Sequence, residues 1–585
     1  MHTRPRRTNR ATQAAALATA ALLLAGTVQQ APAQTAETLQ EQREAYDAVR
    51  AKSVVELQPF RKTVTATDTA AELEITFIDL NPNVGAWYLL RTRTGAKQAP
   101  AQYHLENPEP GTRQVALDPT GPALLVDGKP CRPWADEALS KAQQTGLAYA
   151  PICDGRLYLR NRVRGARTTL EATAEFLRDN IWGGENIVRF VRDSFFKDSQ
   201  LETGDAKGST ARTGADAGPP PMQTDFAPGE RPVISTLLDM ALVGADPKQM
   251  GIGLWYPVSD LPGVFASTFQ PRYIADAVLK GPGKVNWLDG VESRATGYMV
   301  AFDMAQFGIG YAVGTDHPAM DWSPRPPWNV RPKGLPGPDG IGNANPLVML
   351  GMVNPEIADK AVATFTAGFK RSHGAFKYGD MAGFNYGHHY GFIEKGVVLS
   401  KLWPGLSTLF VLTDGSLHMK TWTEADNALL PQIEFARQNG VPIIETDPQT
   451  GTGVPGDRVT QWGPGNWSGS AKAELRTLRA GGCMVRAHGT RYLIYGYFST
   501  ATPSAMARTF QAYGCDYAML LDMNALEHTY LAVYARKGGK VHVEHLVPGM
   551  TLIEKKMSDG TILPRFIGFA DNRDLFYLTR KEPPK

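Results

Sequence analysis

The strongest concentration of reactive side chains follows a short apolar run at residues 518–521. Asp522 comes directly after this run, and Asn524, Glu527 and His528 follow shortly after it. The run predicts a buried strand, which would hold Asp522 rigidly at its end beside a cleft. A carboxylate in that position can act as nucleophile or base, and Glu527 or His528 can then donate a proton.

The same residues also allow a plainer interpretation. Asp522 and Glu527 can cap turns or pair with nearby arginines, as most such carboxylates do. A helix after the strand would turn Glu527 or His528 away from the cleft. The spatial arrangement of these groups decides between the two interpretations.

A second polar segment lies at residues 369–390, and nine of the 11 histidines fall in the second half of the chain. Six side chains of this segment are candidate substrate ligands: Lys370, Arg371, His373, Asp380, His388 and His389. Adjacent strand residues face opposite sides, so at most one of the last two histidines enters any pocket. Because the histidines lack metal-ligand spacing, and no dinucleotide or P-loop motif occurs, we predict neither a metal nor a cofactor.

The N-terminus has the pattern of an export signal. Residues 4–10 carry four arginines, residues 14–25 are rich in alanine and leucine, and Ala31-Pro32-Ala33 offers a cleavage site. We therefore predict a signal peptide at 1–33 and a periplasmic or secreted protein without a membrane segment afterwards. Removing the four arginines leaves 57 of the 61 basic residues against 58 acidic ones, which argues against nucleic acid as a partner.

The remaining chain divides into two modules of mixed strands and helices, so the predicted fold class is α+β. Residues 34–202 form a smaller N-terminal α+β module, with strand-like runs at 73–78, 86–90 and 156–159 and a capping box at Thr168 and Glu171. Residues 203–231 are rich in proline, glycine and alanine and predict a linker. Residues 232–585 form the second module, with a helix at 505–513 between two strands and a proline-rich surface loop at 323–342.

Export makes disulfides possible, and the chain has four cysteines. They fall into two sequence-local couples, Cys131 with Cys153 and Cys483 with Cys515. Four cysteines allow three pairings, and the local pairing is the most economical of them.

From about residue 360 to 535 the order of motifs resembles the phosphodiester glycosidase family. The segment 362–369 resembles the family's Asn-Gly-Gly-Phe region, and 412–416 with Trp422 resembles its Asp-Gly turn and following strand. Arg479-Ala480-Gly481 is similar to its Arg-Thr-Ala segment, and 521–524 to its Leu-Asp-Gly-Gly motif. The resemblance implies a C-terminal mixed α/β module of this type, with Arg479 lining the pocket and Asp522 inside it.

The chain departs from the family at the motif asparagine and glycines. Thr366 and Ala367 replace the Asn-Gly pair, while Met523 and Asn524 replace the two glycines after the aspartate. Because glycine alone adopts a positive φ freely, the pocket shape must differ from that of the family. Only Arg479 and Asp522 match, so the family's pocket roles extend to those two positions.

The sequence therefore predicts an exported hydrolase of a glycosyl or glycosyl-phosphodiester bond. In this hypothesis Arg479 holds the phosphate, Asp522 acts at the anomeric carbon, and Glu527 or His528 protonates the leaving oxygen. Thr366 and Asn524 join the six candidate ligands as substrate contacts. The alternatives are a non-catalytic carbohydrate- or cell-wall-binding protein on the same scaffold, and an N-terminal module that docks the second module onto a partner.

Overall fold

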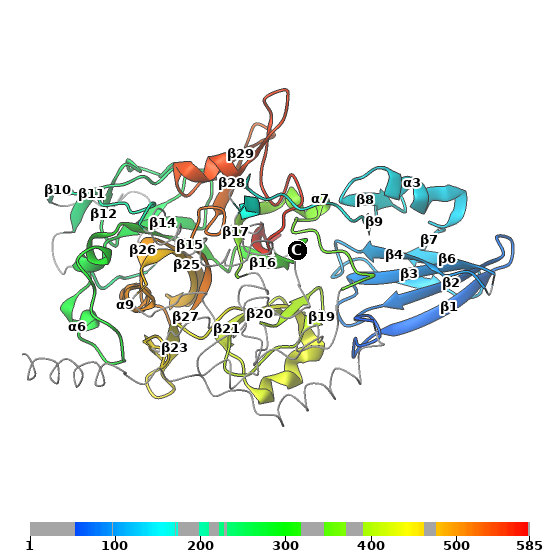
Figure 1. Ribbon diagram of the computed structural model, residues 1–585, viewed down its shortest axis with the longest axis horizontal. Helices are drawn as coiled ribbons and strands as arrows, with labels where there is room; N and C mark the ends of the chain where they lie inside the picture. Colours follow the sequence, from blue (N-terminus) through cyan, green and yellow to red (C-terminus); the bar gives the residue numbers. More distant parts are fainter. Residues whose placement is uncertain are drawn as a thin grey trace, which may run out of the picture.

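The computed structural model describes residues 53–95, 97–169, 171–173, 198–209, 222–226, 231–316, 344–369, 390–460 and 475–582. The predicted signal peptide, most of the predicted helical run after Thr168 and the proline-rich loop at 323–342 lie outside these residues. Figure 1 shows the N-terminal strands gathered at one end of the molecule and the later strands forming a larger body beside them.

The N-terminal module is built on an antiparallel sheet of six strands. Their order is β1–β2–β3–β4–β9–β8, with bounds Lys62–Asp68, Leu73–Asp79, Trp87–Thr94, Ala101–Glu106, Leu157–Arg160 and Tyr149–Ile152. A small sheet of β5 (Val115–Asp118), β6 (Ala123–Val126) and β7 (Lys129–Cys131), together with helix α3 (Ala138–Gln144), contributes to a separate apolar core around Phe77. Three predicted strand-like runs are confirmed as β2, β3 and β9.

The second module contains an eight-stranded sheet at its centre. The strands are β13 (Trp255–Pro257), β14 (Val264–Phe269), β15 (Gly297–Asp303), β26 (Thr490–Ala501), β25 (Thr477–Ala487), β27 (Tyr517–Met523), β23 (Ile444–Thr446) and β24 (Gly453–Pro455), in that order. The predicted helix between two strands is α9 (Pro503–Ala512), and Thr502 caps it by accepting the backbone N–H of Ala505. This mixture of strands and helices is an α+β fold.

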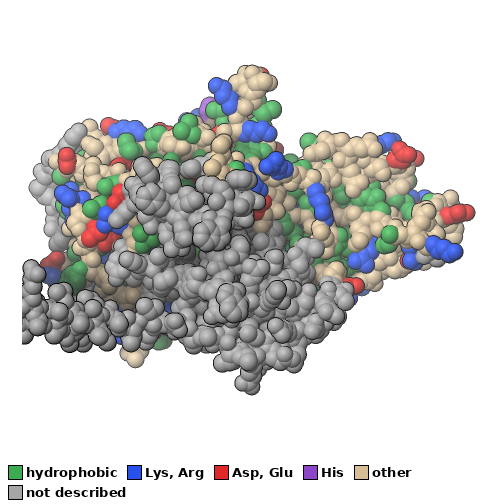
Figure 2. All heavy atoms as spheres, in the orientation of Figure 1, with side chains coloured by type: hydrophobic (Ala, Val, Ile, Leu, Met, Phe, Trp, Pro, Cys, Tyr) green, Lys and Arg blue, Asp and Glu red, His purple; other side chains and the backbone are tan. Residues whose placement is uncertain are grey.

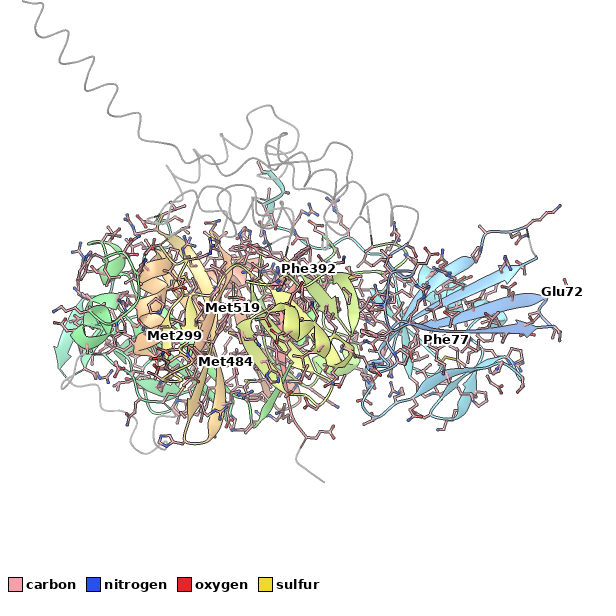
Figure 3. All side chains as sticks on the ribbon, turned by 90° about the horizontal axis from the view of Figure 1, so that it is seen from below. Glu72, Phe77, Met299, Phe392, Met484 and Met519 are labelled. Atoms are coloured by element: carbon pink, nitrogen blue, oxygen red, sulfur yellow. A yellow bond between two sulfur atoms is a disulfide. The ribbon has the colours of Figure 1, made fainter. Side chains whose placement is uncertain are left out.

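Two five-stranded sheets complete the larger body. One has the order β16 (Phe307–Ala312), β32 (Leu575–Arg580), β17 (Ala361–Thr366), β28 (Leu531–Lys537) and β29 (Lys540–His545). The other has the order β19 (Val397–Ser400), β18 (Phe392–Glu394), β22 (Ile433–Gln438), β20 (Ser407–Leu412) and β21 (Leu417–Thr421). In Figure 3, Met299, Met484 and Met519 lie inside the larger body, and Phe392 lies between them and Phe77 of the N-terminal module.

The remaining elements are short. The small strands are β10 (Ala206–Ser209), β11 (Pro232–Ser235), β12 (Gln249–Gly251), β30 (Lys555–Lys556) and β31 (Ile562–Leu563). The short α-helices are α6 (Asp276–Leu279) and α7 (Pro355–Ala358). The 3-10 helices are η1 (Ala135–Glu137), η4 (Pro271–Tyr273), η5 (Glu292–Arg294), η6 (Glu424–Gln432) and η7 (Pro548–Ile553).

Two-residue turns set the register of several hairpins. His488 and Gly489 join β25 to β26, and both residues have a positive φ, so Ala487 lies directly opposite Thr490. This geometry matches the right-handed twist of the strands. Gly538 and Gly539 form the same kind of turn between β28 and β29.

The described parts of the predicted linker at 203–231 pack against the second module. Strand β10 pairs with β11, and Met222 and Phe226 are buried in the core of the larger body. Just before this segment, Glu202 accepts a hydrogen bond of 2.5 Å from the Tyr298 hydroxyl. Apolar side chains within an otherwise polar segment explain this packing, since their burial stabilises contact with the sheet.

A buried polar network joins the two modules. Arg160 of β9 contacts Glu106 of β4, lies 3.8 Å from Glu394 of β18, and donates to the Val348 carbonyl at 3.0 Å. Asn354 of the second module donates to Glu106 at 2.9 Å. Because buried charges need partners, this network ties the N-terminal sheet to the larger body at one position.

The four cysteines form two disulfides, Cys131–Cys153 and Cys483–Cys515, as the sequence-local pairing predicts. The Cα atoms are 5.6 Å apart in the first pair and 5.9 Å apart in the second. Both bonds are compatible with an exported protein. No helix in the described part of the chain is long and apolar enough to span a membrane.

Candidate functional site

Strand β27 positions Asp522 in the candidate site. All seven residues of the strand are buried, which confirms the buried strand predicted from the apolar run. Asp522 is its penultimate residue rather than the first residue after it, and its side chain is 4% exposed. Its Oδ1 accepts the backbone N–H of Met523 at 2.9 Å, which fixes the orientation of the carboxylate.

Arg573 is the centre of the site. It belongs to the polar run 571–574, all of it buried, that directly precedes β32. One terminal nitrogen donates to Oδ2 of Asp522, and the other donates to Oε1 of Glu171 at 2.7 Å and to Nε2 of His528 at 2.6 Å. The Arg573 cluster is defined here as Arg573, Asp522, Glu171, His528 and Glu527.

Arg573 keeps its charge inside the protein. Burial alone would lower the pKa of its guanidinium, but the carboxylates of Glu171, Asp522, Glu527 and Asp571 raise it further than burial lowers it. Its Nε has no hydrogen-bond partner among the described residues. The guanidinium therefore holds two carboxylates and an imidazole in fixed positions around it.

The hydrogen bonds of His528 define its proton position. A guanidinium only donates, so Nε2 of His528 must offer its lone pair to Arg573. A carbonyl oxygen only accepts, so Nδ1 carries the proton that is donated to the Met523 carbonyl at 2.8 Å. These two partners place the ring proton of His528 on Nδ1, and the residue is partly exposed.

Glu527 is the member of the cluster for which no direct hydrogen bond to Arg573 is seen, and its side chain and backbone carbonyl have different partners. Its Oε1 accepts from the Thr168 hydroxyl at 3.1 Å, and its carbonyl accepts from Arg565 at 2.6 Å. Burial raises the pKa of the Glu527 carboxyl, but the charge of Arg573 and the hydrogen bond from Thr168 are among the effects that leave the pKa below its ordinary value. Glu527 is therefore a carboxylate at neutral pH.

A second ion pair, between Arg565 and Asp571, supports the position of Arg573. Arg565 binds Asp571 through two hydrogen bonds of 2.8 Å and 3.0 Å. Oδ1 of Asp571 also accepts the backbone N–H of Arg573 at 2.9 Å. The hydrogen bonds of this pair fix the backbone at Arg573. The fixed backbone in turn sets the direction of the Arg573 guanidinium.

Two of the predicted substrate contacts border the cluster. Asn524 follows β27 with a φ of 82°, a left-handed conformation that asparagine adopts more readily than most residues with a β-carbon. Its Oδ1 accepts from the Thr477 hydroxyl at 3.1 Å. Thr366, at the end of β17, is buried and donates to the Glu527 carbonyl at 3.3 Å.

Arg479 lies on the neighbouring strand and directs its guanidinium elsewhere. It is paired with Met523 across β25 and β27, yet its nitrogens donate to the carbonyls of Ala501 and Leu475 and approach Sδ of Met523. Its side chain is fully buried. Among the described residues, Arg573 rather than Arg479 is the cation that contacts Asp522.

The six remaining candidate ligands lie outside the described residues: Lys370, Arg371, His373, Asp380, His388 and His389. The described residues contain no group of three side chains that could hold a metal ion. Tyr390, at the end of the polar segment 369–390, is fully buried and takes part in the core.

Sequence reasoning missed four charged residues of the site: Glu171, Arg565, Asp571 and Arg573. Glu171 was predicted only as part of a capping box; its N–H does bond to the Thr168 hydroxyl, but its carboxylate binds Arg573 and Asn572. One signal was available. The run Asp571-Asn572-Arg573-Asp574 directly precedes a strongly apolar strand, and so many polar groups at a strand end are unusual unless they are paired.

The described charged groups of the site include more carboxylates than guanidinium groups. Four carboxylates, those of Glu171, Asp522, Glu527 and Asp571, surround two guanidinium groups, those of Arg565 and Arg573. This excess of negative charge stabilises a neighbouring cation in a poorly solvated place. Cleavage at a sugar's anomeric carbon passes through such a cation-like transition state.

Comparisons with known proteins find only distant similarity. No family model and no curated protein matches the sequence. Among solved structures, the catalytic domain of zebrafish N-acetylglucosamine-1-phosphodiester alpha-N-acetylglucosaminidase, auto-inhibited by its pro-peptide, aligns at 10% identity over 56% of this chain and 85% of that chain, with a TM-score of 0.29. The "Putative exported protein" of Burkholderia pseudomallei K96243 aligns at 12% identity over 89% of this chain and 98% of that chain, with a TM-score of 0.14. The chain thus has weak structural similarity to a glycosidase domain.

Proposed function

We propose that the protein is an exported hydrolase that cleaves glycosyl phosphodiester bonds at the Arg573 cluster. The observation that carries this proposal is the convergence of Asp522, Glu171 and His528 on one buried guanidinium, with the Glu527 carboxylate beside them. The order of motifs between residues 360 and 535 points in the same direction.

Asp522 is the residue assigned to the anomeric carbon. Its two oxygens receive hydrogen bonds from Arg573 and from the Met523 N–H, so its direction does not change during the reaction. In hydrolysis the bond between the anomeric carbon and the phosphate oxygen breaks, a water hydroxyl joins that carbon, and the remaining proton of the water is released to solvent. Asp522 either forms the transient covalent bond or stabilises the cation-like transition state electrostatically.

The protonation states of the cluster favour a phosphodiester as the leaving group. An ordinary glycoside needs a proton donor for its leaving oxygen, whereas a glycosyl phosphodiester releases a weakly basic phosphate that leaves as an anion. Glu527 is ionised, and the ring N–H of His528 is already donated to the Met523 carbonyl, so neither is poised as a proton donor. The proton-donor role predicted for these two residues is replaced here by electrostatic stabilisation. Lys370 and Arg371 are the proposed contacts of the phosphate, because the Arg479 guanidinium is fully buried and donates to backbone carbonyls.

Release of sugar from matched substrates tests the proposal. For each sugar in a panel, the purified protein is given the phosphodiester and the alkyl glycoside of the same sugar. The proposal predicts release from the phosphodiester at a rate at least about a hundredfold above that from the alkyl glycoside, because only the latter requires a general acid. Equal rates of release from the phosphodiester and the alkyl glycoside would contradict the leaving-group argument. The protein would then still be a hydrolase.

A carbohydrate-binding protein without catalysis is the second candidate. The observation that favours it is that Asp522 is hydrogen-bonded on both oxygens, as in a purely structural ion pair. This candidate predicts that saccharide binding survives in Asp522→Asn and that neither form releases sugar from any member of the panel. Sugar release by the wild type excludes it.

A further inference from the structure

The N-terminal module carries a cleft that is separate from the Arg573 cluster. It has a volume of about 950 Å³, which lies within the range of small-molecule sites. The cleft lies between the six-stranded sheet and the segment at 345–348 of the second module. It is lined by Ser53, Glu56, Arg91, Pro100, Gln102, Tyr103, His104, Gln143, Leu159, Arg160, Asn161, Arg162, Asn345, Pro346 and Val348.

Strand alternation explains why polar residues gather there. Arg91 of β3 lies directly opposite Gln102 of β4, and Leu89 lies opposite His104, so these side chains share one face of the sheet. Further along the same face, Trp87 packs into the core of the larger body. The opposite face carries Leu90 and Leu105, which belong to the module's own core. The cleft therefore opens where this face of the sheet stops packing against the larger body.

Two arginines of the cleft have no acidic partner among the residues that the structure describes. Arg91 donates to Oε1 of Gln102 at 3.1 Å, and Arg162 donates to Oδ1 of Asn345. Neither forms an ion pair with any carboxylate in the described part of the chain, so neutral amides orient them and leave their charge uncompensated. Glu56 is the only acidic residue among the described residues that line the cleft. In Figure 2, Lys and Arg side chains are visible where the two modules meet.

A buried histidine adds an unfilled hydrogen-bond donor. Nδ1 of His104 accepts the backbone N–H of Val348 at 2.9 Å, so the proton of the neutral ring is on Nε2. Burial, together with the charge of Arg160, lowers the pKa of His104 well below its ordinary value, so the ring stays neutral. The side chain is 2% exposed, and its Nε2 has no hydrogen-bond partner among the described residues. An unpaired buried donor is costly, and a ligand oxygen would relieve that cost.

We propose that this cleft binds an acidic saccharide, with Arg91 and Arg162 holding its anionic group. Planar guanidinium groups bind carboxylate, sulfate or phosphate oxygens through paired hydrogen bonds. The lining is mostly polar, whereas sites for apolar ligands are mostly apolar, so the ligand carries many hydroxyl or amide groups. Single-stranded nucleic acid would need aromatic stacking faces, and Tyr103, the aromatic residue of the described lining besides His104, packs on the opposite core.

Calorimetric titration of the purified protein tests the assignment. The probes are a galacturonic acid hexasaccharide, a sulfated hexasaccharide and neutral maltohexaose. The variant is Arg91→Gln with Arg162→Gln; both side chains reach the solvent, so the fold should tolerate their replacement. The control is Arg93→Gln, two residues along β3, whose arginine is paired with Glu74 and does not line the cleft.

The proposal predicts that at least one acidic probe binds and that the neutral probe binds at least about tenfold more weakly. It also predicts a loss of about tenfold or more in the double variant and no change in Arg93→Gln. Preference for the carboxylated or the sulfated probe identifies the anionic group. Failure of both acidic probes to bind, or equal losses in the double variant and in Arg93→Gln, would overturn the proposal. Because the readout is binding, the result does not depend on whether the Arg573 cluster is catalytic.

Discussion

At the scale of single residues, one guanidinium organises the candidate site. Arg573 is 2% exposed and contacts Asp522, His528 and Glu171, of which the first two are close in sequence and the third is distant from both. A buried ion pair contributes little net stability compared with an apolar pair, but removing one member leaves the others unpaired. Arg573 is therefore indispensable for the arrangement of the cluster, whatever chemistry the cluster performs.

Replacing Arg573 should destabilise the fold strongly. We expect Arg573→Met to lower the free energy of unfolding by about 3–5 kcal/mol, because two buried carboxylates lose their counter-ion. Arg93→Met, which removes the half-exposed pair with Glu74, should cost no more than about 1 kcal/mol. Chemical denaturation of both variants measures the difference. Equal stability of the two variants would show that the Arg573 cluster is not held by its charges.

At the scale of elements, the end of β27 sets the position of Asp522. The strand ends at Met523, and Asn524 then adopts a φ of 82° with its N–H bonded to the Leu478 carbonyl at 2.8 Å. Residues with a β-carbon other than asparagine and aspartate rarely occupy this region. Asparagine at position 524 therefore suits the left-handed turn that ends β27.

This turn can be tested with two variants of Asn524. Asn524→Ala and Asn524→Gly both remove the hydrogen bond with Thr477, so the difference between them isolates the backbone. We expect the alanine variant to be less stable than the glycine variant by about 1 kcal/mol, measured by urea unfolding. Equal stabilities would mean that the backbone at this position is not left-handed in solution.

Locally determined elements could be predicted from the sequence, and long-range pairing could not. Strand β27, helix α9 and several short strands follow from apolar runs and caps, which are properties of neighbouring residues. The strand order of the central sheet depends on contacts such as β15 with β26, whose residues are almost 200 positions apart. The same distinction applies to the site. Asp522, Glu527 and His528 are close in sequence, whereas Glu171 and Arg573 are separated by 402 positions and carry no shared local signal.

At the scale of the whole molecule, a buried polar network couples the two modules. Glu394 of β18 is almost completely buried, lies 3.8 Å from Arg160 of β9 and accepts the N–H of Val313 at 2.9 Å. Burial raises the pKa of the Glu394 carboxyl from 4.5 to about 7, and the charge of Arg160 offsets only part of this effect. The junction between the modules therefore changes its charge near neutral pH.

This raised pKa predicts how stability depends on pH. The folded protein binds the Glu394 proton more tightly than the unfolded chain, so this contribution to stability is complete below pH 4.5 and is lost as pH rises towards about 7. The loss amounts to about 3 kcal/mol. Glu394→Gln should remove it, so the decline of the melting temperature from about pH 5 to about pH 8 becomes shallower.

Glu434→Gln provides the matched control for this experiment. Glu434 lies on β22, partly exposed and 3.7 Å from Lys395, so its replacement should leave the pH dependence of the wild type unchanged. A wild-type melting temperature that does not fall over this range, or a fall of the same size in Glu394→Gln, would contradict the assignment to Glu394.

The central claim is that the Arg573 cluster is the catalytic site of a hydrolase, and the rate of sugar release from a glycosyl phosphodiester tests it most directly. The rate is measured for the wild type, for Asp522→Asn and for Asp276→Asn, which changes an exposed carboxylate at the start of α6. Melting curves confirm that each protein is folded. The account predicts equal rates for the wild type and Asp276→Asn, and a rate at least about a hundredfold lower for Asp522→Asn. Equal release by all three folded proteins would contradict it.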